Sequence, residues 1–277
     1  MNIGFCAGVT AAALVAGAAS AATSVEIRDA AVMVTVVPEA RPDVKVSVVR
    51  TNPKLPLRIS NLGDRVAVNG GLFGRNVNCH GDVDTPGARI WGTGDFGPDD
   101  LPRIVIRTPL DVRIRTGAAV FGDIGRAASV DLSAGGCGAW TVANVSGLLR
   151  VASAGSGDVH AGSAGSAQLR IGGAGGITMR DVAAGLDAST AGSGDMTIAS
   201  VRGPLRARIV GSGDIIVNGG GVTTMDATVL GAGDIKLSGV AQSLNARILG
   251  SGDVAVDRVS GPVNKSVMGS GSVSVGG

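Results

Sequence analysis

The chain has 277 residues, 46 of them glycine, with 2% aromatic residues and no tyrosine. Its formal net charge of +2 at pH 7 is too small to favour nucleic acid or an anionic membrane surface as a partner. Abundant glycine with few aromatic residues is typical of a narrow, turn-rich β architecture, because glycine adopts the backbone angles of tight corners and weakens helices.

The N-terminus has the composition of an export signal. Residues 3–18 are apolar and small, and Ala19-Ser20-Ala21 fits a small-x-small cleavage site. The apolar run is shorter than the about 20 residues of a membrane span, which disfavours the alternative of an N-terminal anchor. We therefore predict a signal peptide over residues 1–21. The mature protein is expected in the periplasm, at the cell surface or outside the cell, with no membrane span.

Residues 22–109 form a region of short β-branched runs separated by turn signals such as Asn52-Pro53 and Gly63-Asp64. We predict a strand-rich cap on the repeats described below, because the open end of a stack of strands exposes unpaired backbone groups. The runs occupy residues 24–28, 32–37, 44–49, 57–60 and 65–68.

Residues 70–103 are rich in Gly and Asp and show no clear strand pattern, so they are predicted to form an irregular loop. Long loops inside a compact domain tend to be functional or disordered. This loop also holds most of the aromatic residues that follow the signal. Its candidate recognition residues are Phe73, His80, Trp91 and Phe96.

Two cysteines remain once the signal is removed, Cys79 and Cys137. Cysteines in an oxidising compartment usually pair, so we predict a disulfide between them. Cys79 also begins the cluster Cys79-His80-x-Asp82-x-Asp84, which offers possible metal ligands. A thiolate beside hard carboxylates, without a second Cys/His pair, is a weak zinc signal, so no metal and no other cofactor is expected.

Residues 110–277 contain one short phrase at a period of 19 or 20 residues, the signature of a solenoid. Four copies read Gly-Ser-Gly-Asp, a fifth reads Gly-Ala-Gly-Asp, and the last reads Gly-Ser-Gly-Ser. With weaker copies included, the phrase marks about nine turns. The copies begin at Gly136, Gly155, Gly173, Gly192, Gly211, Gly231, Gly250 and Gly269, preceded by a looser copy at Thr116.

Between the phrases, apolar and polar residues alternate with a period of two. Leu205, Ala207 and Ile209, for example, alternate with Arg206 and Arg208. This alternation predicts short strands with one buried face, whereas a helix would show a period of 3.6. The fold class is therefore all-β, a parallel β-helix, and the general preference for right-handed crossovers predicts right-handed winding.

The recurrent Gly-Ser-Gly-Asp-Ile/Val corners of a glycine-rich β-solenoid resemble the putative autotransporter adhesin, head GIN domain family. The resemblance covers roughly residues 116–277, with a strand-rich segment upstream. It implies an adhesive role and supplies no catalytic residues.

The repeat stacks one aspartate per turn along a single corner. Each carboxylate is expected to accept backbone N–H bonds from its own glycine-rich turn, which would offset repulsion along the column. Calcium between successive turns is the alternative, and one Asp per turn supplies few of the six or more oxygens that Ca²⁺ needs. The column consists of Asp158, Asp195, Asp214, Asp234 and Asp253.

No serine or acid stands at a spacing that would make a triad with His160, and the Gly-Ser-Gly-Asp phrase is neither a nucleophile elbow nor a phosphate loop. We therefore expect no enzymatic activity. The predicted function is an exported structural or adhesin-like protein of the cell envelope that binds an unidentified protein or glycan surface ligand. The alternative is a polysaccharide-active β-helix enzyme or a glycan-binding module. It rests on outward arginines, namely Arg150, Arg170, Arg206, Arg208 and Arg247.

Overall fold

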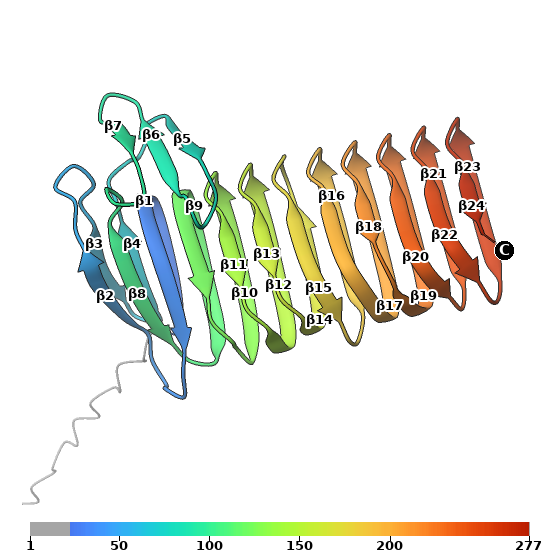
Figure 1. Ribbon diagram of the computed structural model, residues 1–277, viewed down its shortest axis with the longest axis horizontal. Helices are drawn as coiled ribbons and strands as arrows, with labels where there is room; N and C mark the ends of the chain where they lie inside the picture. Colours follow the sequence, from blue (N-terminus) through green and yellow to red (C-terminus); the bar gives the residue numbers. More distant parts are fainter. Residues whose placement is uncertain (1–22, 277) are drawn as a thin grey trace, which may run out of the picture.

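The computed structural model describes residues 23–276, which form strands joined by turns and short loops (Figure 1). The predicted signal peptide, residues 1–21, lies outside the described residues. The strands are β1 (Ser24–Pro38), β2 (Lys45–Arg50), β3 (Arg58–Leu62), β4 (Arg65–Asn69), β5 (Val77–His80), β6 (Gly87–Ile90), β7 (Gly94–Phe96), β8 (Arg103–Thr108), β9 (Asp111–Ile124), β10 (Ser129–Gly136), β11 (Trp140–Val142), β12 (Val145–Gly155), β13 (Val159–Ala161), β14 (Ala164–Ile171), β15 (Ile177–Val182), β16 (Leu186–Gly192), β17 (Met196–Gly211), β18 (Ile215–Val217), β19 (Gly220–Gly231), β20 (Ile235–Ala241), β21 (Leu244–Gly250), β22 (Val254–Val259), β23 (Val263–Gly269) and β24 (Val273–Val275).

From β9 to β24 the chain winds into about nine stacked turns, which confirms the predicted β-solenoid (Figure 1). Each turn places a longer strand before the glycine corner and a shorter strand after it. Both strands pair in parallel with the equivalent strands of the next turn. In the last turns, β21 pairs with β23 and β22 pairs with β24, without a register shift. Equivalent residues of successive turns are therefore stacked in columns along the axis.

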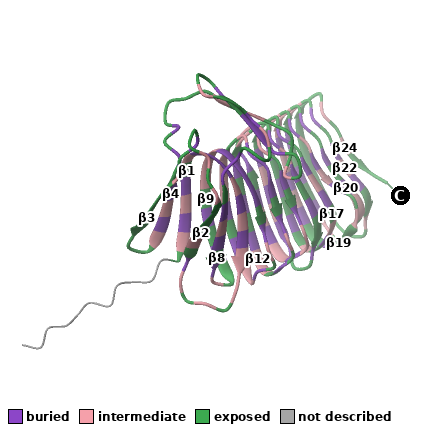
Figure 2. Cartoon of the chain, turned by 60° about the vertical axis from the view of Figure 1, so that its left-hand side comes forward, coloured by how far each residue is buried: buried purple, intermediate pink, exposed green. Residues whose placement is uncertain are grey.

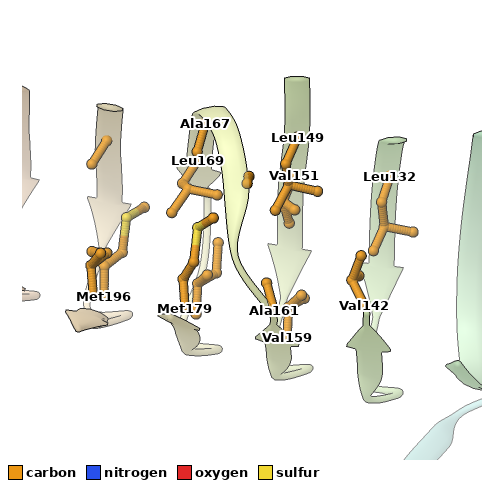
Figure 3. Packing of buried hydrophobic residues seen from close by; sticks show 14 of the residues in the cluster. Leu132, Val142, Leu149, Val151, Val159, Ala161, Ala167, Leu169, Met179 and Met196 are labelled. Carbon is orange, nitrogen blue, oxygen red and sulfur yellow. The ribbon is translucent and has the colours of Figure 1, made fainter. Parts of the chain in front are cut away.

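The interior is filled by the apolar half of each alternating strand, which appears as bands of buried residues in Figure 2. One interior column runs through Ala207, Ala227 and Ala246, all no more than 2% exposed. Figure 3 shows similar columns nearer the N-terminus, where Leu149 and Val151 of one turn lie beside Ala167 and Leu169 of the next. Small and medium aliphatic side chains suit this narrow core, so the low aromatic content is a consequence of the architecture.

Trp140 is the exception, since its large ring lies in the narrow interior and is 1% exposed. It stacks against Gly122 of the preceding turn. A side-chain carbon at Gly122 would lie closer than 3.0 Å to the indole ring. The missing side chain of Gly122 therefore makes the space that Trp140 fills.

The N-terminal region is more than the cap predicted from the sequence, because β1 is itself a complete turn of the solenoid. It pairs in parallel with β9 on one side and with β4 and β8 on the other. β4 and β8 together form the outermost turn, and β2 and β3 join it as antiparallel strands. The order along the axis thus differs from the order along the chain, since β1 lies between β8 and β9.

Residues 70–102 interrupt the outermost turn between the end of β4 and the start of β8, and we call this segment the insertion. An irregular loop is predicted here, and that prediction is wrong: β5, β6 and β7 form a three-stranded antiparallel sheet. The sheet packs on a small second core over the corners of neighbouring turns. This core includes Ala31 of β1, Phe121 of β9, and Ile90 and Phe96 of the insertion.

Among residues 23–276, no helix is long and apolar enough to cross a membrane.

Candidate functional site

The insertion is fixed to the solenoid by a covalent bond. Cys79 of β5 and Cys137 at the corner between β10 and β11 form a disulfide, with Cα atoms 5.5 Å apart. The pairing predicted from the cysteine count is therefore confirmed. The bond joins residues 58 positions apart and holds the small sheet over the corners. A disulfide is typical of a protein located outside the cytoplasm.

Two of the predicted recognition residues lie on the surface of the insertion. Phe73 is 86% exposed and Trp91 is 82% exposed, more than any other large hydrophobic side chain of residues 23–276. Phe96 does not belong with them. It is 4% exposed and packs in the second core, because the antiparallel pairing of β6 and β7 turns its side chain toward the solenoid. Phe96 thus helps to hold the insertion on the solenoid.

His80 lies in an ionic cluster at the surface of the small sheet. Its Nε2 lies 2.8 Å from Oδ1 of Asp95, and Nη2 of Arg89 donates to Oδ2 of Asp95 over 2.7 Å. The hydrogen bonds from Arg89 and from His80 hold the pKa of the Asp95 carboxyl below its usual range. Asp95 therefore ties β5, β6 and β7 together as an anion.

The structure separates the residues of the predicted Cys-His-Asp-Asp cluster. Cys79 is in the disulfide, and His80 contacts Asp95. Asp82 stabilises its own turn. Its Oδ1 accepts hydrogen bonds from the backbone N–H and the hydroxyl of Thr85 and from the backbone N–H of Asp84. These hydrogen bonds lower the pKa of the Asp82 carboxyl. The cluster is thus divided among a disulfide, an ion pair and a turn.

The aspartate column exists as predicted, but its hydrogen bonds run differently. We predict that each carboxylate caps its own turn. Instead each Oδ1 accepts the backbone N–H of the equivalent residue one turn further on: Asp214 accepts from Asp234 over 2.8 Å, and Asp234 from Asp253 over 2.7 Å. Asp158, Asp195 and Asp253 accept in the same way from Gly176, Asp214 and Ser272. The carboxylates therefore link adjacent turns.

The glycines of the same corners stack so closely that side chains would collide. Gly211 and Gly231 have positive φ angles of 130° and 141°. A side-chain carbon at Gly213 or Gly233 would lie closer than 3.0 Å to the carbonyl oxygen of the glycine one turn below. The Gly-x-Gly-Asp phrase thus combines two roles, close backbone contact by the glycines and a bond between turns by the aspartate.

The outward face of the long strands from β14 to β23 carries two columns of polar side chains. The first, which we call the mixed column, runs through Asp187, Arg206, Asp226, Asn245 and Asn264. The second, the arginine column, runs through Arg170, Ser189, Arg208, Thr228, Arg247 and Ser266. Between them lies a groove of about 510 Å³ that extends from β17 to β23.

Beside the arginine column, toward the glycine corners, an apolar column faces solvent. It includes Val210, Leu249 and Met268, which are 41%, 52% and 71% exposed. His160, which the sequence assigns to no site, is exposed on another strand and stacks between Thr141 and Thr178. Arg150, the remaining outward arginine, donates from Nε to Oε1 of Gln168 over 3.0 Å.

Comparisons with known proteins agree with this architecture. Residues 102–221 match the family model described as "putative auto-transporter adhesin, head GIN domain", which confirms the resemblance seen in the repeats. The chain is also similar to a crystal structure of a "putative lipid binding protein" from Parabacteroides distasonis. The TM-score is 0.52 at 17% identity, over 92% of this chain and 93% of that one. At this identity the likeness concerns the fold alone. No curated protein matches the chain.

Proposed function

From the premise that residues 102–221 carry the adhesin-like head GIN domain, we propose that the protein is an exported, non-catalytic binding rod of the cell envelope. It binds a protein or glycan surface ligand through the insertion. The observation that carries the proposal is the pair of exposed rings, Phe73 and Trp91, in the loops of an insertion that a disulfide fixes to the rod.

The exposed rings of Phe73 and Trp91 suit recognition because the insertion that carries them is held rigidly on the solenoid. Exposed aromatic side chains supply large contact area for little loss of conformational entropy, and they are enriched where binding energy is concentrated. Below them, Phe96 and Ile90 anchor the small sheet to the solenoid, and the Cys79–Cys137 bond restricts its movement. The ligand would thus meet a surface that is already ordered, which lowers the entropic cost of binding.

The non-catalytic role is supported by how the carboxylates are used. The five aspartates of the corner column each accept a backbone N–H of the next turn. Asp82 and Asp95 are held by the turn and the ion pair of the insertion. These seven carboxylates therefore stabilise the fold through hydrogen bonds and an ion pair, which favours a structural role for them over a catalytic one.

The test is binding of the oxidised protein to an array of defined glycans and purified surface proteins. We expect wild type to bind and the double variant F73A/W91A to lose binding by about tenfold or more, since truncating a central aromatic residue commonly costs this much. V240A is the control, because Val240 is 39% exposed on β20 of the solenoid, outside the insertion.

Equal binding by wild type and F73A/W91A would contradict the role of the insertion. Turnover of a bound glycan by the wild-type protein would contradict the non-catalytic proposal.

A further inference from the structure

The arginine column alternates strictly with the turns of the solenoid. Arg170, Arg208 and Arg247 occur in every second turn, and the turns between them place a small hydroxyl residue at the same position. The hydroxyl residues are Ser189, Thr228 and Ser266. Register in the parallel pairing is continuous over this stretch, so the alternation in sequence is an alternation in space.

These three arginines make no ion pair and no side-chain hydrogen bond within residues 23–276. The mixed column beside them differs, because its members bind one another. Asn245 donates to Asp226 over 3.0 Å, Asn264 donates to Asn245 over 3.0 Å, and Arg206 lies 3.9 Å from Asp226. The guanidinium groups of the arginine column therefore remain available to an external anion.

The spacing of these charges follows from the stacking of the strands. Adjacent strands of a sheet lie about 4.8 Å apart, so arginines in alternate turns repeat about every 10 Å. The groove beside them is lined by hydrogen-bonding groups, among them Thr228, Asn245, Asn264 and Ser266. The face thus offers fixed positive charges at regular intervals, with hydroxyl and amide groups between them.

We propose that this face binds a linear acidic polysaccharide with carboxylate or sulfate groups on every second sugar, so that successive anionic groups meet arginines that repeat about every 10 Å. Each guanidinium would donate two parallel hydrogen bonds to one carboxylate or sulfate group, an arrangement that the planar arginine side chain favours. The hydroxyl and amide side chains would bind sugar hydroxyls.

A covalent polymer with a fixed repeat suits this surface better than a bilayer does. Lipid headgroups in a fluid membrane have no fixed repeat, so they would not require arginines in alternate turns. The site is separate from the insertion, so the inference does not depend on the proposed function. Either one can fail while the other holds.

Binding of the intact, oxidised protein to immobilised hyaluronate, which bears a carboxylate on every second sugar, tests the proposal. Neutral dextran and vesicles of phosphatidylserine and phosphatidylcholine are the comparison surfaces. Wild type is expected to bind hyaluronate in a salt-sensitive way and to leave dextran and the vesicles unbound. R208S/R247S should bind at least about tenfold more weakly, because two charge-assisted contacts are lost.

Two further variants separate spacing from overall charge. R208T/T228R exchanges the residues of adjacent turns, so the net charge is unchanged while the interval is broken, and it should bind as weakly as R208S/R247S. R202S/R258S removes two exposed arginines from other columns and should bind like wild type.

Several results would overturn the proposal: failure of wild type to bind hyaluronate, binding to the vesicles instead, or an equal loss in R202S/R258S. Wild-type affinity in R208T/T228R would also overturn it, since this would show attraction by net charge without recognition of a repeat.

Discussion

At the corners, one aspartate oxygen and one backbone N–H join each turn to the next. Asp234 illustrates the pattern, since it accepts from Asp253 and its own N–H donates to Asp214. The presence of the column could be predicted from the spacing of the phrases. The direction of the bonds could not, because an aspartate in a glycine-rich turn has two acceptable sets of donors. Whether the carboxylate accepts from its own turn or from the next turn depends on the distance between the stacked turns, which the sequence does not give.

Replacing Asp234 tests the contribution of this bond. D234A removes the acceptor of the Asp253 N–H, and we expect the free energy of unfolding to fall by about 1–2 kcal/mol, reduced from the buried case because the corner is exposed. D234N keeps an acceptor oxygen and should lose less. Urea denaturation measures both.

The matched control is S251A, because Ser251 is the exposed serine of the next corner and its side chain makes no hydrogen bond among the described residues. A loss in S251A equal to that in D234A would show that the carboxylate has no special part in the corner.

At the scale of elements, the strands of the insertion could not be predicted from the alternation of apolar and polar residues. β5, β6 and β7 have four, four and three residues, too few to reveal a period-two alternation. Their buried apolar residues, Ala88, Ile90 and Phe96, do not form a regular alternating pattern, and Phe96 stands between Asp95 and Gly97. The two exposed aromatic residues and the disulfide could be predicted, since they depend on residue type and on the number of cysteines. The burial of Phe96 depends on strand pairing, which the sequence does not display.

Removal of the disulfide should release the insertion. In C79S/C137S the closed loop is lost, and the chain-entropy estimate for this separation is about 4 kcal/mol. We expect a lower midpoint of chemical denaturation and faster hydrogen exchange in β5, β6 and β7, with the late turns of the solenoid unaffected. Wild type in reductant should behave like the variant. Unchanged exchange in the insertion would show that the second core alone holds it in place.

The ion pair of Asp95 predicts how the insertion responds to acid. Because the folded-state pKa of Asp95 is lowered, its stabilising contribution is complete above the ordinary carboxyl pKa of 3.8 and is lost as the pH falls through the lowered value. D95N should therefore weaken the protection of β6 and β7 from hydrogen exchange near neutral pH, while the two proteins should converge in strong acid. A difference that persists unchanged in strong acid would exclude the ion pair as its source.

At the scale of the molecule, the repeat was sufficient to predict the solenoid because equivalent positions recur every 18–20 residues from residue 116 onward. The place of β1 could not be predicted in this way. Its sequence, Ser24–Pro38, contains Asp29 and Ala30 where the later corners have glycines, so it lacks the phrase that identifies a turn.

The calcium prediction applies to the whole rod. In the aspartate column, one oxygen of each carboxylate accepts a backbone N–H of the next turn, so we expect the corners to need no calcium. Thermal melting of the purified protein in millimolar Ca²⁺ and in chelator should give nearly the same midpoint. A large rise with Ca²⁺ would show that the free carboxylate oxygens coordinate the ion.

The position of β1 between β8 and β9 has a consequence for how the chain reaches its native state. Later turns find their neighbours about 20 residues away, as Asp214 and Asp234 do. Val25 must instead meet Ile114, and Ser24 must meet Arg65, across long intervening segments. Since closing longer loops costs more entropy and slows folding, nucleation is favoured among the later turns. β1 would then be among the last strands to be incorporated, because both of its neighbours in the sheet come from later parts of the chain.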